Sequence, residues 1–127
     1  MRNLLLVGLG GGLGSIARYL VGVQTLRLLG AGWPFGTFAV NILGGLFMGL
    51  LVGLLAHRGG GDQERWRLLL AVGVLGGFTT FSAYTLEVAL MLQRREYGPA
   101  VLYATASTVL ALTALFVGLL AARRLFA

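Results

Sequence analysis

The stretch Gly73-Val-Leu-Gly-Gly-Phe-Thr-Thr-Phe-Ser-Ala-Tyr84 lies in the middle of a long apolar segment, yet a simple lipid-spanning helix has no need of its composition. The adjacent Gly76 and Gly77 weaken a helix, and the hydroxyl groups that follow them compete for backbone hydrogen bonds. At membrane depth, irregular backbone is tolerated only where protein buries it or where it lines a cavity. The stretch therefore predicts a helix that is broken in mid-membrane, with the functional chemistry at the break.

The rest of the composition indicates an integral membrane protein of one domain. The chain has 127 residues, of which 57% are hydrophobic and 11% are charged, whereas a soluble domain carries about 25% charged residues. There is no cysteine, which excludes a disulfide framework and a thiolate metal site. The net charge is +6 and every basic residue is an arginine. These arginines lie near predicted membrane edges, which favours contact with anionic lipid headgroups over binding of nucleic acid.

Four apolar segments are long enough to cross a bilayer, so the predicted fold is an all-α, multi-pass membrane protein. The spans are expected at about residues 4–29, 35–56, 66–92 and 99–122. The first is too long for a signal peptide. Arginines are only modestly more numerous on the side that holds both termini, which weakly favours cytoplasmic termini and leaves insertion in both orientations admissible.

Two glycine patterns predict close packing of helices, because small residues four apart lie on one helix face. They are the pairs Gly8 with Gly12 and Gly10 with Gly14, and the ridge Gly45, Gly49 and Gly53. The first pattern is not a dinucleotide-binding loop, since Leu13 occupies the position of the third glycine and no strand precedes it.

Three polar side chains inside the spans are candidates for function. Arg18 either extends to the membrane interface or places a cation at the mouth of an anion pathway. Asn41 either forms an interhelical hydrogen bond or presents an amide NH2 donor to an anion. Glu87 is expected to pair with Arg94 or Arg95 at the interface, with a place in a vestibule as the alternative.

Hydroxyl groups on the fourth span form a possible polar track opposite the break. Tyr103 and Ser107 share one helix face, which ends at Ala111. Each hydroxyl can instead bond to the carbonyl four residues earlier in its own helix.

Three other function classes compete with an anion pathway. A proton-coupled exporter of organic cations usually needs an ionisable residue near the centre of a span, and none is present. A membrane scaffold, whose glycine ridges only bind partner helices, remains as an alternative. An enzyme is disfavoured because no nucleophile–base pair or metal cluster is apparent.

Three stretches resemble the characteristic motifs of the Fluc/CrcB family of fluoride channels. They are Gly11-Gly-Leu-Gly-Ser-Ile-Ala-Arg-Tyr19, Phe35-Gly-Thr-Phe-Ala-Val-Asn-Ile-Leu-Gly44 and Gly76-Gly-Phe-Thr-Thr-Phe-Ser82. They fall in order in the first three spans, and the resemblance covers essentially the whole chain, although the fourth span matches loosely.

The resemblance implies a passive fluoride channel in the cell membrane that exports cytoplasmic fluoride. It implies four transmembrane helices per subunit and an antiparallel, dual-topology homodimer with two fluoride pathways. It also implies a structural sodium ion at the dimer centre, held by the backbone carbonyls of Gly76 and Thr79. A broken helix does free carbonyl oxygens, and two copies meeting at a two-fold axis can form an oxygen cage for a hard cation.

The resemblance also assigns residues to the fluoride pathway. Position 84 is a tyrosine here rather than the usual phenylalanine, which keeps the positive ring edge and adds a hydroxyl donor. Ala83 replaces a threonine that some relatives have, so the polar track depends more on Ser82 and the fourth span. The implied pathway residues are Arg18, Asn41, Phe81, Ser82, Tyr84, Tyr103 and Ser107.

Overall fold

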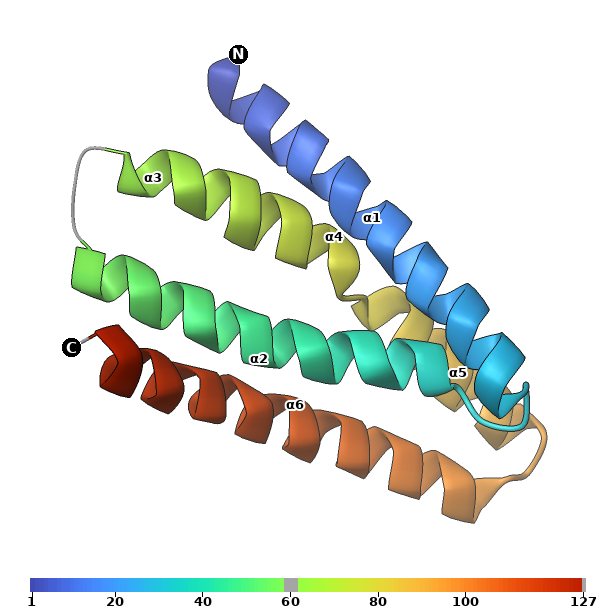
Figure 1. Ribbon diagram of the computed structural model, residues 1–127. Coiled ribbons are helices and arrows are strands. Elements are labelled where there is room, and N and C mark those ends of the chain that lie inside the picture. The colour runs from blue at the N-terminus through green and yellow to red at the C-terminus, as the bar shows by residue number, and fades with distance from the viewer. Residues whose placement is uncertain (59–61, 127) are drawn as a thin grey trace.

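The computed structural model describes residues 1–58 and 62–126, and these residues are almost entirely helical (Figure 1). The elements are α1 (Arg2–Leu29), α2 (Phe35–Arg58), α3 (Gln63–Trp66), the π-helix η1 (Arg67–Leu75), α4 (Gly76–Phe78), α5 (Phe81–Gln93) and α6 (Tyr97–Phe126). The elements from α3 to α5 together make the third crossing. Four helical stretches are long and apolar enough to span a membrane, which confirms the predicted all-α architecture.

Helices α2 and α6 lie side by side along their length (Figure 1). The predicted glycine ridge makes this contact: a Cβ atom added to Gly45 or Gly49 would meet the backbone of α6. Gly118 makes the reciprocal contact, because a Cβ atom there would meet the backbone of α2. The two helix backbones approach closely, as small residues permit in membrane proteins, so the ridge is confirmed as a packing face.

Helix α1 packs across the third crossing through only one of its two glycine pairs. Gly10 and Gly14 are buried, and a Cβ atom on either would meet the backbone of η1. A Cβ atom on Gly8 or Gly12 would meet nothing within 4 Å. Residues two apart lie about 200° apart around a helix, so the second pair faces away from the third crossing. The predicted helix packing is therefore confirmed for Gly10 and Gly14, and for Gly8 and Gly12 it stays a prediction, because one subunit places no helix against them.

The third crossing leaves the helical conformation at Thr79 and Thr80. Their backbone angles are extended, with φ −83° and ψ 158° for Thr79 and φ −151° and ψ 122° for Thr80. The interruption is visible between α4 and α5 in Figure 1. The predicted break is therefore confirmed, although Gly76, with φ −62° and ψ −38°, is still helical.

The break falls after the glycines because the threonines stabilise it locally. The side chain of Thr80 accepts a hydrogen bond from the Ala83 amide and so caps α5. Both threonines are β-branched and suit extended backbone. Gly77 has a different task, since a Cβ atom there would meet the backbone of Gly11 on α1. The glycine permits close packing, and the hydroxyl-bearing residues make the turn.

Two features of the helices were not anticipated. The nine residues of η1 form a π-helix directly before the break, and a π-helix is rare and often lies at a functional site. Helix α6 begins at Tyr97 and contains Pro99 in its first turn, where proline costs no backbone hydrogen bond.

Candidate functional site

Asn41 on α2 holds the backbone of the break in both directions. Its Nδ2 donates a hydrogen bond to the Thr80 carbonyl at 3.2 Å, and its Oδ1 accepts one from the Thr80 amide at 2.9 Å. The amide thus replaces helix hydrogen bonds that the interruption removes. Because Oδ1 must face the Thr80 N–H, the orientation of the carboxamide is fixed. The side chain therefore joins α2 to the third crossing by interhelical hydrogen bonds. One Nδ2 hydrogen remains for another acceptor.

Arg18 on α1 holds the break from another side. Its Nε donates a hydrogen bond to the Gly77 carbonyl at 3.1 Å. The guanidinium is therefore bound to the interior backbone and does not extend to the end of the helix. An arginine has five N–H donors, so the group has further donors beyond the one that it gives to Gly77.

Three carbonyl oxygens at the break, those of Gly76, Phe78 and Thr79, remain without a donor from the described residues. The Thr80 amide, which would otherwise bond to the Gly76 carbonyl, bonds to Asn41, and the Thr79 carbonyl also accepts no hydrogen bond. The described residues contain no cluster of three His, Cys, Asp or Glu side chains. Backbone oxygens are thus the cation ligands that this region offers, and oxygen ligands suit hard cations.

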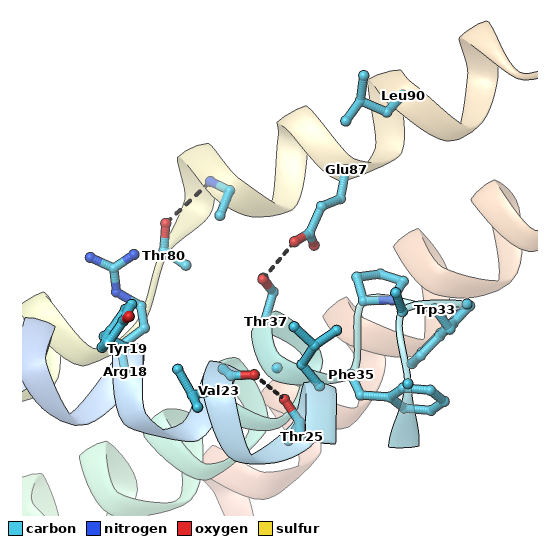
Figure 2. Close-up of a pocket in the computed structure, with 18 of the residues that line it drawn as sticks. Arg18, Tyr19, Val23, Thr25, Trp33, Phe35, Thr37, Thr80, Glu87 and Leu90 are labelled. Carbon is cyan, nitrogen blue, oxygen red and sulfur yellow. Dashed lines mark hydrogen bonds between the residues drawn. The ribbon is translucent and has the colours of Figure 1, made fainter. Parts of the chain in front are cut away.

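A cavity of about 780 Å³ reaches the break from the end of the bundle where α1 meets α2. Arg18, Thr37, Thr80, Glu87 and Arg94 are among its lining residues, and Figure 2 shows the first four around it. Its walls combine arginine, carboxylate and hydroxyl groups with apolar side chains. The cavity thus joins Arg18 and Thr80, at the break, to the end of the bundle.

Glu87 lies in the wall of this cavity and is held by two hydroxyl groups. Thr37 donates to one carboxylate oxygen at 2.8 Å, and Tyr103 donates to the other at 2.6 Å. Figure 2 shows Thr37 and Glu87 pointing toward each other. Arg94 pairs with Glu96 instead, with an N–O distance of 3.3 Å. The expectation that Glu87 pairs with an arginine is therefore wrong, because its side chain turns inward to α2 and α6.

A row of aromatic rings leads from the break into the subunit. The Phe81 side chain is 76% exposed, and its ring is stacked on Tyr84 with 5.6 Å between centroids. The Tyr84 ring lies 5.6 Å from Tyr103, which is fully buried. Tyr103 in turn meets the edge of Trp33 at 5.1 Å. The rings thus join an exposed surface beside the break to the interior of the helix bundle.

The remaining predicted site residues carry hydroxyl groups. Ser82 is exposed at the start of α5, with its Oγ 3.2 Å from the Thr80 hydroxyl. Ser107 on α6 is only 3% exposed, and its Oγ has no hydrogen-bond partner in the described part of the chain. A buried hydroxyl without a partner is costly, so Ser107 has donor capacity available to an unseen acceptor.

The structure thus gathers Arg18, Asn41 and the third crossing into one assembly, which sequence reasoning joined only through a resemblance. Thr37 was not singled out, although it lies four residues before Asn41 on the same helix face. The presence of two polar residues, Thr37 and Asn41, on one face of an apolar helix was the sequence signal that could have identified Thr37. The bond between Thr37 and Glu87 spans 50 residues, and nothing in the local sequence indicates it.

Comparisons with known proteins show the family of the chain. Residues 5–119 match the family model described as CrcB-like protein, Camphor Resistance (CrcB). The chain is 69% identical over 127 residues to the fluoride-specific ion channel FluC of Phenylobacterium zucineum strain HLK1, covering all of both chains. It is 64% identical over 126 residues to the protein of that name from Caulobacter sp. strain K31, covering 99% of this chain and 98% of that one. The protein of that name from Caulobacter vibrioides strain NA1000 is 60% identical over the full length of both chains.

Proposed function

Because the chain belongs to the CrcB family, we propose that it is a passive fluoride-selective ion channel of the cell membrane. Fluoride enters a cell as the neutral acid HF, ionises in a more alkaline cytoplasm and leaves through the channel down its gradient. The observation that carries the proposal beyond family membership is the interruption of the third crossing at Thr79 and Thr80. Asn41 and Arg18 stabilise that interruption, and a polar cavity leads to it.

The functional unit is proposed to be an antiparallel homodimer with two fluoride pathways. A single subunit exposes the polar Ser82 and the backbone of Gly76 beside the break, together with the ring of Phe81. Polar backbone that faces lipid at mid-membrane costs several kcal/mol per group. A second copy that covers this face removes the cost, and a two-fold axis applies the same contact to both subunits.

A structural sodium ion fits the free carbonyl oxygens of the break. The Gly76 and Thr79 carbonyls accept no hydrogen bond from the described residues, and two copies together offer four such oxygens. When bound, the ion supplies positive charge that balances the converging carbonyl dipoles. Arg18 and Asn41 occupy the neighbouring carbonyls of Gly77 and Thr80. Among the carbonyls that stay free, those of Gly76 and Thr79 are the ones that the family resemblance assigns to the cation.

Fluoride is proposed to pass from the cavity to the break along hydrogen-bond donors. Arg18 attracts the anion into the cavity, and its remaining N–H groups can bind it there. Asn41 then offers the Nδ2 hydrogen that Thr80 does not use. Ser82 and the buried Ser107 add hydroxyl groups. Tyr103 lies one turn before Ser107 on α6, with its ring 5.6 Å from that of Tyr84 on α5.

The aromatic rings supply weak binding sites between these donors. The edge of an aromatic ring is electropositive, so the rings of Phe81 and Tyr84 can face an anion without a fixed charge. Conduction requires sites that are strong enough to be entered and weak enough to be left. Beyond Arg18, a succession of ring edges and amide or hydroxyl donors offers fluoride such weak sites without a further fixed charge.

Ion efflux from liposomes tests the function. Vesicles that contain the purified protein and a mixture of fluoride and chloride are diluted into ion-free buffer with valinomycin and potassium, and both anions are followed with electrodes. We expect fluoride to leave the vesicles while chloride is retained. A membrane scaffold predicts that protein-containing vesicles stay as tight to fluoride as empty ones, and that result would overturn the proposal.

A further inference from the structure

The hydroxyl group of Tyr84 is bound to the backbone of α6. Its Oη donates a hydrogen bond to the Ala104 carbonyl at 3.1 Å and lies 3.4 Å from the Thr108 hydroxyl. Thr108 also donates to the Ala104 carbonyl, at 3.0 Å. A phenol has one hydrogen to donate, and both acceptors within reach of that hydrogen belong to the protein. An anion that approached this hydroxyl would meet oxygen lone pairs.

The bond from Tyr84 is one of few side-chain hydrogen bonds between α5 and the other helices of the described residues. In residues 1–58 and 62–126, the side-chain hydrogen bonds from α5 to α6 are those of Tyr84 with Ala104 and Thr108 and that of Glu87 with Tyr103. The hydrogen bonds of Tyr84 lie one turn after the break, at the start of α5. Removing them would leave the first turn of α5 dependent on the contact between Thr80 and Asn41.

The tether also determines the orientation of the exposed ring beside the break. The Phe81 ring is 76% exposed, and within the subunit it is stacked on the Tyr84 ring. The para position of the Tyr84 ring is bound to α6, and one face of the ring packs toward the buried Tyr103. These two contacts fix the plane of the Tyr84 ring. Because the Phe81 ring is stacked on the Tyr84 ring, its orientation is fixed as well.

We propose that Tyr84 is a positioning residue whose hydroxyl anchors the ring pair of Phe81 and Tyr84 to α6 and does not bind fluoride. This replaces the expectation that the hydroxyl is an extra donor to the ion. The effect on ion flux rests on the proposed function, whereas the tether itself does not. Tyrosine at this position thus differs from phenylalanine by a bond within the protein.

The test uses Tyr84→Phe, which keeps the ring and removes the hydroxyl, with Thr108→Val as the matched control. Thr108→Val removes the neighbouring hydroxyl and leaves the bond from Tyr84 to the Ala104 carbonyl. Thermal unfolding in detergent and initial fluoride efflux at a series of fluoride concentrations are measured for both. For Tyr84→Phe we expect Tm to fall by about 3 °C and maximal flux to fall about threefold, with the half-saturating fluoride concentration unchanged. Thr108→Val should stay close to the parent protein in all three.

Two results would overturn the proposal. A half-saturating concentration that rises in Tyr84→Phe while Tm stays constant would make the hydroxyl a fluoride ligand. If neither flux nor Tm changes, the hydroxyl anchors nothing. A parent protein that releases no fluoride would refute the proposed function instead, and the difference in Tm between Tyr84→Phe and Thr108→Val would still decide whether the tether exists.

Discussion

The α2–α6 pair and the third crossing solve the problem of packing in lipid in different ways. Between α2 and α6, glycines bring the two backbones together, and no side-chain hydrogen bond joins them in the described residues. Helix α5 is instead attached through polar side chains, which include Asn41, Tyr84 and Glu87. In the α2–α6 pair two unbroken helices pack against each other. The third crossing has two extended residues at its centre, Thr79 and Thr80.

The difference separates the scaffold of the subunit from its site. In lipid the hydrophobic effect does not drive helices together, so close van der Waals packing must stabilise the rigid pair. A break in a transmembrane helix has the opposite requirement, since its freed polar groups need partners from neighbouring helices. Substitutions should accordingly impair folding in the first region and ion flux in the second.

The largest effect is expected for Gly49→Ala in the scaffold. Its Cβ atom would meet the backbone of Leu115 and the Leu119 amide nitrogen on α6, and backbone cannot move aside as a side chain can. We expect a destabilisation of about 3 kcal/mol, seen as loss of the monodisperse peak in size-exclusion chromatography. Gly8→Ala is the matched control, because its Cβ atom meets nothing within 4 Å. Equal yields of folded protein from both variants would contradict the assignment of α2–α6 as the scaffold.

Asn41→Asp should lower fluoride flux about a hundredfold. The carboxylate keeps an acceptor for the Thr80 amide, loses the donor to the Thr80 carbonyl and repels the permeating anion. Gln24→Glu makes the same chemical change at an exposed position on α1 outside the cavity lining. Liposome efflux should be normal for that control. A normal rate for Asn41→Asp would exclude Asn41 from the pathway.

Phe81→Ile should reduce fluoride flux by at least about tenfold, because an aliphatic side chain has no electropositive edge. Phe116→Ile is the control, since Phe116 is also exposed, at 56%, and lies on α6 away from the break. The two variants thus compare the same change, phenylalanine to isoleucine, beside the break and on α6. If both variants conduct equally, the ring at position 81 has no role in permeation.

A smaller effect is expected from withdrawal of sodium. Exchange of sodium for N-methyl-D-glucamine should lower Tm by about 5 °C if sodium is present at about a hundred times its dissociation constant. Hydrogen exchange should increase around Gly76 and Thr79 and stay unchanged along α2 and α6. Identical Tm values in the two buffers would remove the support for a structural cation at the break.

The sequence sufficed for the features that depend on local composition. The four spans, the ridge from Gly45 to Gly53 and the interruption of the third crossing follow from hydropathy, small-residue spacing and clustered hydroxyl groups. It did not predict that the interruption lies at Thr79 and Thr80, since helix weakening by the glycines competes with capping by the threonines.

Contacts between distant residues were not predictable from local patterns. Glu87 lies near arginines in the sequence, yet its partners are Thr37 and Tyr103, which are brought to it by α2 and α6. The bond from Arg18 to Gly77 spans 59 residues. The π-helix also gave no signal, because an apolar segment such as Arg67–Leu75 reads equally well as an α-helix.

The central claim is that fluoride crosses the membrane beside the interruption of the third crossing, and a single introduced thiol tests it most directly. The chain has no cysteine, so Ser82→Cys places a unique thiol next to the break, and Leu112→Cys places one on the exposed face of α6. Fluoride efflux is measured from vesicles before and after quantitative labelling with a bulky methanethiosulfonate. The account predicts that labelling stops efflux through Ser82→Cys and leaves Leu112→Cys unaffected. Undiminished efflux through fully labelled Ser82→Cys would contradict it.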